Sequence, residues 1–456
     1  MQDKLFVCDD PNRKVELKAE LQSLKDMIVD EQLQYCSKEI KEAYAQAIKK
    51  TSKPFTLWHL DFARVFRDNG GFDIVIGNPP YVDSEEMTKN LPLEREMYAK
   101  KFKCAKGNWD LYIPFWENGF NLLNENGNIS LITPNKWLAI KYGAALREFI
   151  TPYLYNINDY SDFYAFESAD VSTVVAMAQK RICDTITATK FDDIYTIIKN
   201  KIVNKEVIAP FDNLSLCLSD NFDTLYSILK NPKLEENFNI SGAATVSETY
   251  EIATLVEDIT NPDSETYFKF INTGIIDKFE TQWGTEIMTY VKVKYQNPVV
   301  NKESLKKAFP KRYAQAISPK LITTGIRYFE VFGDFQGEYF AAKSTEIITP
   351  KNSISIKTIL PILNSNVVFF FLKEAYGGMA MGGGITFSPD NLSKIPIPHV
   401  DKEATESLHS MADRYANRFS EQDQNELDKF VYELYGLNST EKAVIENFKV
   451  KNQRKR

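Results

Sequence analysis

The sequence predicts an α/β fold in the first half of the chain, followed by an α+β domain with many short strands and a helical C-terminus. Three observations predict it: apolar runs alternate with helical spacing up to about residue 200, short β-prone runs follow, and helical spacing returns after residue 400. The 456 residues are 43% hydrophobic and 26% charged, which is typical of globular domains. We expect four segments, at 1–53, 54–200, 201–400 and 401–456.

The N-terminal segment predicts a pair of helices. Asp9-Asp10-Pro11 combines acidic capping residues with proline in the first turn, which is a helix-start signal. Ser52-Lys53-Pro54 ends the helical pattern. We expect a helical hairpin that packs on a neighbouring domain through one apolar stripe: Leu17, Leu21, Leu24, Ile28, Leu33, Ile40, Tyr44 and Ile48.

Strands and helices alternate between residues 72 and 177. Phe72 to Ile76 follows the turn residues Asn69-Gly70-Gly71 and predicts a buried strand. Alternation of this kind favours a largely parallel sheet. The further elements that we expect are a helix at 109–123, a turn at 124–128, a strand at 129–133, a helix at 141–150 and a strand at 171–177.

Beyond residue 200, short β-prone runs alternate with polar turns, at 321–324, 339–342 and 346–349. The last segment, 401–447, predicts helix because Leu408, Met411, Tyr415 and Phe419 recur on one face. These patterns predict a β-rich second domain that ends in helices.

Composition excludes several classes of protein. The five cysteines form no C-x-x-C pair and the three histidines are isolated, so neither a disulfide framework nor a metal site is indicated. The N-terminus has no leader pattern, and the longest strongly apolar run, Val367 to Leu372, is far shorter than the roughly 20 residues of a membrane helix. We expect a cytoplasmic protein without a metal. Its net charge of −7 disfavours non-specific coating of nucleic acid but leaves local patches able to bind it.

The most specific feature is Asn78-Pro79-Pro80-Tyr81, directly after the predicted strand and Gly77. Ligands of α/β sheets bind at the carboxyl ends of strands. The prolines hold the loop rigid and force Asn78 into an extended conformation, so its side-chain amide can project. This carbonyl and a diproline carbonyl could both accept from an –NH₂ group, while Tyr81 offers a flat face to the attached ring. Such a site fits a base pulled out of its duplex. The alternative is an ordinary Pro-Pro turn.

The tetrapeptide resembles the catalytic motif of amino-methylating DNA methyltransferases, above all those that act on adenine N6. The resemblance implies that Asn78, Pro79, Pro80 and Tyr81 are catalytic, that S-adenosylmethionine donates the methyl group and that double-stranded DNA is the substrate. The wider pattern is similar to Type IIG restriction–modification enzymes, which join methylation, recognition and often cleavage in one chain. The similar segments are Phe55 to Phe66, Gly70 to Asp73, Asp110 to Leu138 and Tyr142 to Arg147.

The resemblance extends to a second aromatic residue and to a second domain. Phe166 precedes Val171 to Val175 at a spacing similar to the family's second aromatic site, which implies contact with the flipped adenine; the alternative is a core phenylalanine.

The resemblance also implies two domains. Residues 54–200 would be the C-terminal half of a Rossmann-like methyltransferase domain, and 201–400 a target-recognition domain. The segments similar to that domain are Phe270 to Gly274, Pro319 to Ile322, Leu363 to Asn366 and Ile395 to Pro398.

A basic stretch lies within the predicted recognition domain. Between Lys292 and Arg327 the only acidic residue is Glu303, and aromatic residues are interleaved. Such a stretch is typical of phosphate contact, although a solvated charged face is the alternative. Its nine basic residues are Lys292, Lys294, Lys302, Lys306, Lys307, Lys311, Arg312, Lys320 and Arg327.

The chain departs from the family pattern in its cofactor-binding motif. The family binds S-adenosylmethionine through a strand and a Gly-rich turn N-terminal to the catalytic motif, and residues 1–77 do not contain them. We therefore expect this chain to be the C-terminal part of a larger enzyme, a truncated gene product or a split subunit. Its partner would be the missing N-terminal methyltransferase or nuclease portion, and in a complete domain Asp61 would lie near the cofactor.

The sequence is compatible with two functions. The first is the catalytic-loop and recognition portion of an adenine-N6 DNA methyltransferase from a Type II restriction–modification system, inactive when isolated. The second is a non-catalytic DNA-binding specificity module, or a truncated relic, that acts with a partner. The tetrapeptide favours the first hypothesis, and the absent cofactor motif favours the second.

Overall fold

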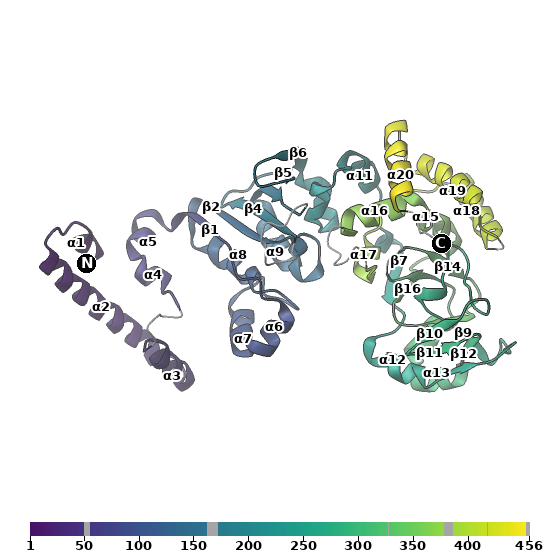
Figure 1. The fold of residues 1–456 in the computed structure, drawn as a ribbon, viewed down its shortest axis with the longest axis horizontal. Helices are drawn as coiled ribbons and strands as arrows, with labels where there is room; N and C mark the ends of the chain where they lie inside the picture. The colour runs from purple at the N-terminus through teal and green to yellow at the C-terminus, as the bar shows by residue number, and fades with distance from the viewer. Residues whose placement is uncertain (50–54, 162–171, 327, 378–385, 417, 453–456) are drawn as a thin grey trace. The chain divides into compact units, whose positions relative to one another are not determined.

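The computed structural model describes residues 1–49, 55–161, 172–326, 328–377, 386–416 and 418–452 (Figure 1). Its contacts divide the chain into two compact units. The first unit comprises Met1–Thr133, Glu148–Ile157 and Val175–Cys183, and the second comprises Pro134–Arg147, Asn158–Val174 and Asp184–Arg456. The division into four segments stays a prediction. Phe166 and Arg327 lie outside the described residues.

The first unit begins with three helices, α1 (Gln2–Phe6), α2 (Pro11–Gln34) and α3 (Lys38–Ala47). The predicted helix start is confirmed, because the Asp10 carboxylate accepts hydrogen bonds from the backbone N–H groups of Asn12 and Arg13. The predicted packing of the apolar stripe is wrong. Leu17 is buried, but Leu24, Ile28, Ile40 and Ile48 are exposed. Helical spacing indicates an apolar face and does not say which element covers it.

Two short helices, α4 (Trp58–Asp61) and α5 (Ala63–Asn69), lead into strand β1 (Phe72–Gly77). Aromatic rings of these helices and of Phe62 between them gather around Phe72, with centroid distances of 5.9 Å to Trp58, 5.2 Å to Phe62 and 5.6 Å to Phe66. Gly71 lies where a Cβ atom would meet the Leu122 carbonyl oxygen at 2.6 Å, so only glycine lets the two segments approach. The other helices of this unit are α6 (Ser84–Asn90), α7 (Pro92–Lys101) and α8 (Tyr112–Asn121).

Strand β1 pairs in parallel with β2 (Leu123–Pro134). Phe72 pairs with Leu123 and Ile74 with Asn128, so the predicted turn at 124–128 is an irregularity inside β2 instead of a separate turn. The six-stranded sheet has the order β1-β2-β4-β3-β5-β6, which confirms the predicted α/β class. Its remaining strands are β3 (Leu154–Asp159), β4 (Thr173–Gln179), β5 (Thr185–Phe191) and β6 (Ile197–Asn204).

The expectation that β1 is buried is wrong. It is the edge strand of the sheet, and its Ile74 and Ile76 side chains are 69% and 79% exposed. An apolar run predicts a strand but does not fix its place in the strand order, and an edge strand has a neighbour on one side only.

The β-rich part of the second unit contains two four-stranded sheets, with orders β14-β13-β16-β7 and β15-β9-β12-β8. A separate antiparallel ribbon consists of β10 (Met288–Tyr290) and β11 (Val293–Tyr295). Buried residues of both sheets and of the ribbon, among them Phe270, Tyr290 and Ile347, share one hydrophobic core. The sheet strands are β7 (Phe238–Gly242), β8 (Val256–Asp258), β9 (Tyr267–Ile271), β12 (Pro298–Asn301), β13 (Lys320–Thr324), β14 (Val331–Asp334), β15 (Tyr339–Ala341) and β16 (Thr345–Pro350).

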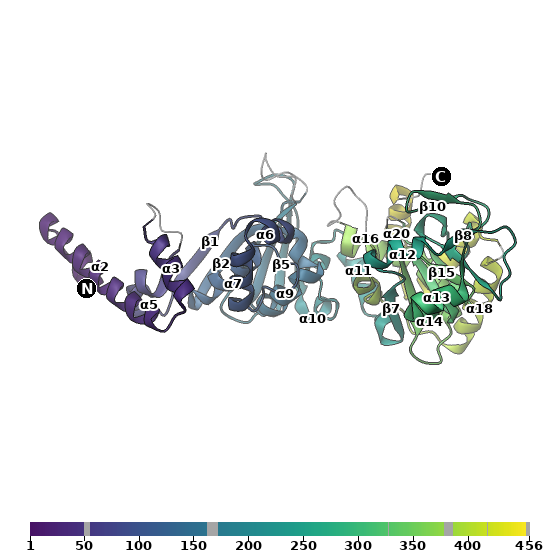
Figure 2. The same cartoon turned by 90° about the horizontal axis from the view of Figure 1, so that it is seen from below.

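Helices complete the second unit (Figure 2). Leu408, Met411 and Tyr415 of α18 are buried, as the spacing predicts. Among the described residues no single helix is long and apolar enough to cross a membrane; α15 and α16 meet that test only as a pair bent by 66°. Helix α9 (Ala144–Ile150) has residues in both units. The helices of the second unit alone are α10 (Lys205–Ile208), α11 (Phe222–Leu229), α12 (Val246–Ala253), α13 (Lys302–Ala308), α14 (Pro310–Ile317), α15 (Ile356–Leu363), α16 (Asn366–Tyr376), α17 (Pro389–Ser393), α18 (Lys402–Tyr415), α19 (Glu421–Leu434) and α20 (Ser439–Asn452).

Candidate functional site

The Asn-Pro-Pro-Tyr tetrapeptide forms the loop that follows β1. Asn78 and Pro80 are exposed, Pro79 is buried and Tyr81 is half-buried. The loop therefore lies at the carboxyl end of a strand in an α/β sheet, which is where such sheets bind ligands. The exposed Asn78 side chain is accessible to a ligand, while Pro79 fixes the backbone beside it.

Tyr81 holds the loop against the neighbouring strand. Its hydroxyl donates a hydrogen bond to the Ile132 carbonyl near the carboxyl end of β2, at 3.2 Å. Burial raises the pKa of Tyr81 to about 12, so the hydroxyl keeps its proton at neutral pH and acts as a donor. The hydroxyl end of the ring is thus held in place, which limits the swing of the side chain about χ1.

The segment after the loop is tied to residues 107–111. The Val82 carbonyl accepts a hydrogen bond from the Leu111 N–H at 2.9 Å. Arg95 of α7 donates to the carbonyls of Trp109 at 3.2 Å and Gly107 at 2.9 Å, and its guanidinium lies 4.8 Å from the centre of the Trp109 ring. The sequence alone did not indicate Arg95, because only the folded chain brings α7 next to residues 107–111.

The predicted cofactor residue, Asp61, is engaged within the N-terminal helices. Its Oδ1 atom lies 2.6 Å from Lys25 Nζ of α2, and its Oδ2 atom accepts from the Leu57 N–H at 3.1 Å. Within 1–49 and 55–71 the structure contains helices and no strand. These described residues therefore do not form a strand with a Gly-rich turn, and they do not fit S-adenosylmethionine by themselves.

Five lysines of the basic stretch are exposed. Lys292 and Lys294 belong to the β10–β11 ribbon, Lys306 and Lys307 to α13 and Lys311 to α14. Lys302 is half-buried, with its Nζ atom donating to the Ser264 carbonyl at 2.7 Å.

Arg312 and Lys320 are engaged inside the domain. Arg312 pairs with Glu248 at 2.8 Å and donates to the Gly242 carbonyl at 2.9 Å; the Arg312 guanidinium lowers the pKa of Glu248 to about 2. Lys320 is 1% exposed, and its ammonium contacts Asp334 Oδ2 at 2.5 Å and the Ala316 carbonyl at 2.6 Å. The expectation that Lys320 contacts phosphate is therefore wrong, because its ammonium is buried and paired with Asp334. Strand β13 is buried on both faces, so its lysine points inward.

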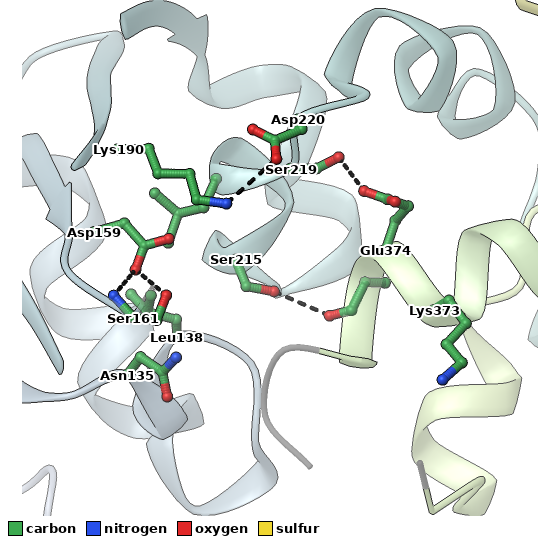
Figure 3. Close-up of a pocket in the computed structure, with 12 residues that line it drawn as sticks. Asn135, Leu138, Asp159, Ser161, Lys190, Ser215, Ser219, Asp220, Lys373 and Glu374 are labelled. Atoms are coloured by element: carbon green, nitrogen blue, oxygen red, sulfur yellow. Dashed lines mark hydrogen bonds and ion pairs between the residues drawn. The ribbon is translucent and has the colours of Figure 1, made fainter. Parts of the chain in front are cut away.

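The second unit also holds a polar pocket of about 260 Å³ (Figure 3). Four of its charged groups meet neighbours within the protein. Lys190 lies 3.3 Å from Asp220, and Glu374 accepts from the Ser219 hydroxyl at 2.5 Å. The Asp159 carboxylate accepts from the Ser161 N–H at 3.0 Å. Because these contacts already engage most of the charged lining side chains, we assign no ligand to this pocket.

Residues 5–171 match the family model described as Eco57I restriction-modification methylase. Over most of its length the chain is related to Type II methyltransferases of restriction–modification systems, which confirms the predicted resemblance.

Two proteins of known sequence and one of known structure are similar to this chain to different extents. The Type II methyltransferase M.BstVI of Geobacillus stearothermophilus is 22% identical over 86% of this chain and 78% of its own. The Type II restriction enzyme and methyltransferase RM.Eco57I of Escherichia coli is 28% identical over 27% of this chain, and the match spans only 13% of that enzyme. The solved Type IIL restriction-modification enzyme MmeI has a TM-score of 0.45 and 12% identity, covering 83% of this chain and 56% of its own.

Proposed function

We propose that this chain provides the catalytic loop and the DNA-recognition domain of a site-specific adenine-N6 DNA methyltransferase. The observation that carries the proposal is the loop at the end of β1, where Asn78 is exposed and Tyr81 is fixed by its hydrogen bond to β2. Its relatives are Type II DNA methyltransferases, in agreement with this role.

The proposed role of the loop is to prepare an adenine amine. Asn78 Oδ1 and the Pro79 carbonyl would accept the two hydrogens of the N6 amino group. These two hydrogen bonds would make the lone pair of the amino nitrogen less conjugated with the ring, so the nitrogen would become a better nucleophile. Tyr81 would stack on the base once it has left the duplex, and Phe166 is proposed to contact it as well. No general base is required, because the proton can pass to water after the new N–C bond has formed.

S-adenosylmethionine is the methyl donor that we propose, because it supplies an electrophilic methyl group. The described N-terminal residues do not fit it alone, so we propose that a cofactor-binding half on another segment or subunit completes the domain. Asp61 stays a predicted neighbour of the cofactor in that complete domain.

We expect residues 1–456 alone to bind S-adenosylmethionine weakly or not at all. Titration calorimetry of this chain with the cofactor is the measurement. A clear isotherm with a dissociation constant in the micromolar range would contradict the prediction, because it would mean that helices α1–α5 or the neighbouring loops form a cofactor site unaided.

The recognition domain is proposed to bind double-stranded DNA through its exposed lysines. Lys292, Lys294, Lys306, Lys307 and Lys311 have the exposure that phosphate contact requires. Three further residues stay predicted DNA contacts: Lys302, Arg312 and Arg327. The Lys302 ammonium and the Arg312 guanidinium already form hydrogen bonds within the domain. A non-catalytic specificity module that acts with a partner is the second candidate function, favoured by the helical N-terminus.

Neutralising the helical lysines should weaken DNA binding in a salt-dependent manner. Each phosphate contact adds about 0.9 to the slope of log affinity against log salt, so Lys306→Gln, Lys307→Gln and Lys311→Gln together should reduce the slope by up to roughly three. The loss should be similar for any sequence, because phosphate contacts position without specifying. Fluorescence anisotropy across a salt series measures the slope.

A triple variant at exposed lysines outside the stretch, Lys38→Gln, Lys402→Gln and Lys429→Gln, is the matched control, since it removes the same charge. If both triple variants change the slope equally, net charge and not the α13–α14 surface determines DNA binding.

A further inference from the structure

The β10–β11 ribbon has one buried face and one exposed face. Its register pairs Met288 with Tyr295 and Thr289 with Lys294. Met288 and Tyr295 are buried in the domain core, together with Tyr290. Alternation along the strands therefore places Thr289 and Lys294 directly opposite each other on the outer face, where both are exposed.

The ribbon is anchored to the rest of its domain. The Tyr290 hydroxyl donates to the Thr249 carbonyl at 3.1 Å, and the Tyr290 ring meets the Phe270 ring edge to face at 4.9 Å. The Asn272 side-chain amide donates to the Thr289 carbonyl at 2.9 Å. These contacts hold β10 through the Tyr290 side chain and through the Thr289 carbonyl, so the outer side chains project from an anchored strand.

The turn of the ribbon retains an unfavourable conformation. Its two central residues, Val291 and Lys292, have φ angles of +44° and +68°. A two-residue hairpin loop with both φ values positive strongly prefers Asn-Gly, and a β-branched residue is a rare occupant of this region. Strained backbone concentrates at functional sites, and here it places the Lys292 side chain at the tip of the ribbon.

Charge distinguishes the ribbon further. Residues 288–295 contain two lysines and no acidic residue, in a chain whose net charge is −7. A two-stranded antiparallel ribbon fits the major groove of B-DNA, and its outward side chains then face the base edges. Lysine pairs with the O6 and N7 atoms of guanine, while threonine offers a hydroxyl to a base edge or a methyl group to thymine.

From this arrangement we infer that the β10–β11 ribbon is the specificity-determining element of the chain and enters the major groove of the target DNA. Lys294 reads a guanine, Thr289 reads an adjacent base pair and Lys292 contacts a backbone phosphate. The inference rests on the proposed function, because it names the residues through which the recognition domain would select its sequence.

The test is selection of bound duplexes from a randomised pool by the 456-residue chain, followed by sequencing. The wild type is expected to enrich one motif. Lys294→Gln is expected to replace guanine by adenine at one position, because glutamine pairs with adenine N6 and N7. Thr289→Ala is expected to weaken the preference at a neighbouring position, because it removes the hydroxyl that contacts the base edge.

Two controls separate base reading from other effects. Val291→Asn relieves the turn and keeps the outer face, so it should leave the motif unchanged. Lys306→Gln with Lys307→Gln should lower affinity while keeping the motif. Circular dichroism and melting curves establish that each variant is folded; if Lys294→Gln alone were unfolded, Lys294→Ala would take its place and should flatten the same position.

Each outcome decides between the two proposals. An unchanged motif with both Lys294→Gln and Thr289→Ala overturns the ribbon as the reading element and leaves the proposed function intact. A wild-type chain that binds duplex DNA without enriching any motif overturns the ribbon proposal and the recognition role together. A chain that does not bind DNA at all overturns the proposed DNA-binding function itself.

Discussion

Asn78→Ala should lower the rate of DNA methylation by about 10²- to 10³-fold in an enzyme that joins this segment to a cofactor-binding half, because it removes one preorganised hydrogen-bonding group from the reacting amine. Asn78 is exposed at the end of β1, so the substitution removes no core packing. DNA affinity should change little, since most of it resides in phosphate contacts. Single-turnover transfer of labelled methyl groups measures the effect.

The matched control for this variant is Asn90→Ala, at the exposed end of α6 in the same unit. It removes the same amide and should leave methylation within a few-fold of wild type. If Asn78→Ala behaved like this control, the loop after β1 would not be the active site, and the non-catalytic specificity module would be the better description of the chain.

Asp334→Ala is expected to destabilise the second unit by about 3–5 kcal/mol, because it leaves the buried Lys320 ammonium without its charge partner. Asp334 is 2% exposed and also accepts from the backbone N–H groups of Gly337 at 2.9 Å and Tyr339 at 3.0 Å. Burial lowers the pKa of Lys320 even though Asp334 opposes the shift, which reflects the cost of a charge at this position.

Scanning calorimetry should record this loss as a fall in the unfolding temperature on the order of 10 °C. Asp192→Ala, which removes an exposed carboxylate from the β5–β6 turn, should shift it by about 1 °C or less. Similar shifts for the two variants would contradict the view that Lys320 and Asp334 form a structural pair, and would reopen a role for Lys320 in DNA contact.

The features that local sequence determines could be predicted. The Asp10 cap of α2 and strand β1 each depend on neighbouring residues, and both are found where the sequence places them. The position of Asn78 at a strand end follows from the same local pattern, so the candidate site could be proposed before the fold was known.

The features that depend on tertiary neighbours could not be predicted. The exposure of Ile76 follows from the edge position of β1, which requires the strand order. Lys320 faces inward because β13 is buried at every position and lies between two other strands. A run of lysines in the sequence does not reveal this strand order. The β10–β11 ribbon was missed because Val291-Lys292 lacks the Asn-Gly or Asp-Gly signal of a short hairpin.

The loop from Asn78 to Tyr81 is proposed to direct methylation to adenine N6 in a recognised DNA site. The most direct test is mass spectrometry of the deoxynucleosides from duplex DNA, after incubation with deuteromethyl-labelled S-adenosylmethionine and an enzyme that carries this segment and a cofactor-binding half. We expect labelled N6-methyldeoxyadenosine, lost in the Asn78→Ala variant. Label on cytosine, or label on adenine that persists at the wild-type level in Asn78→Ala, would contradict the account.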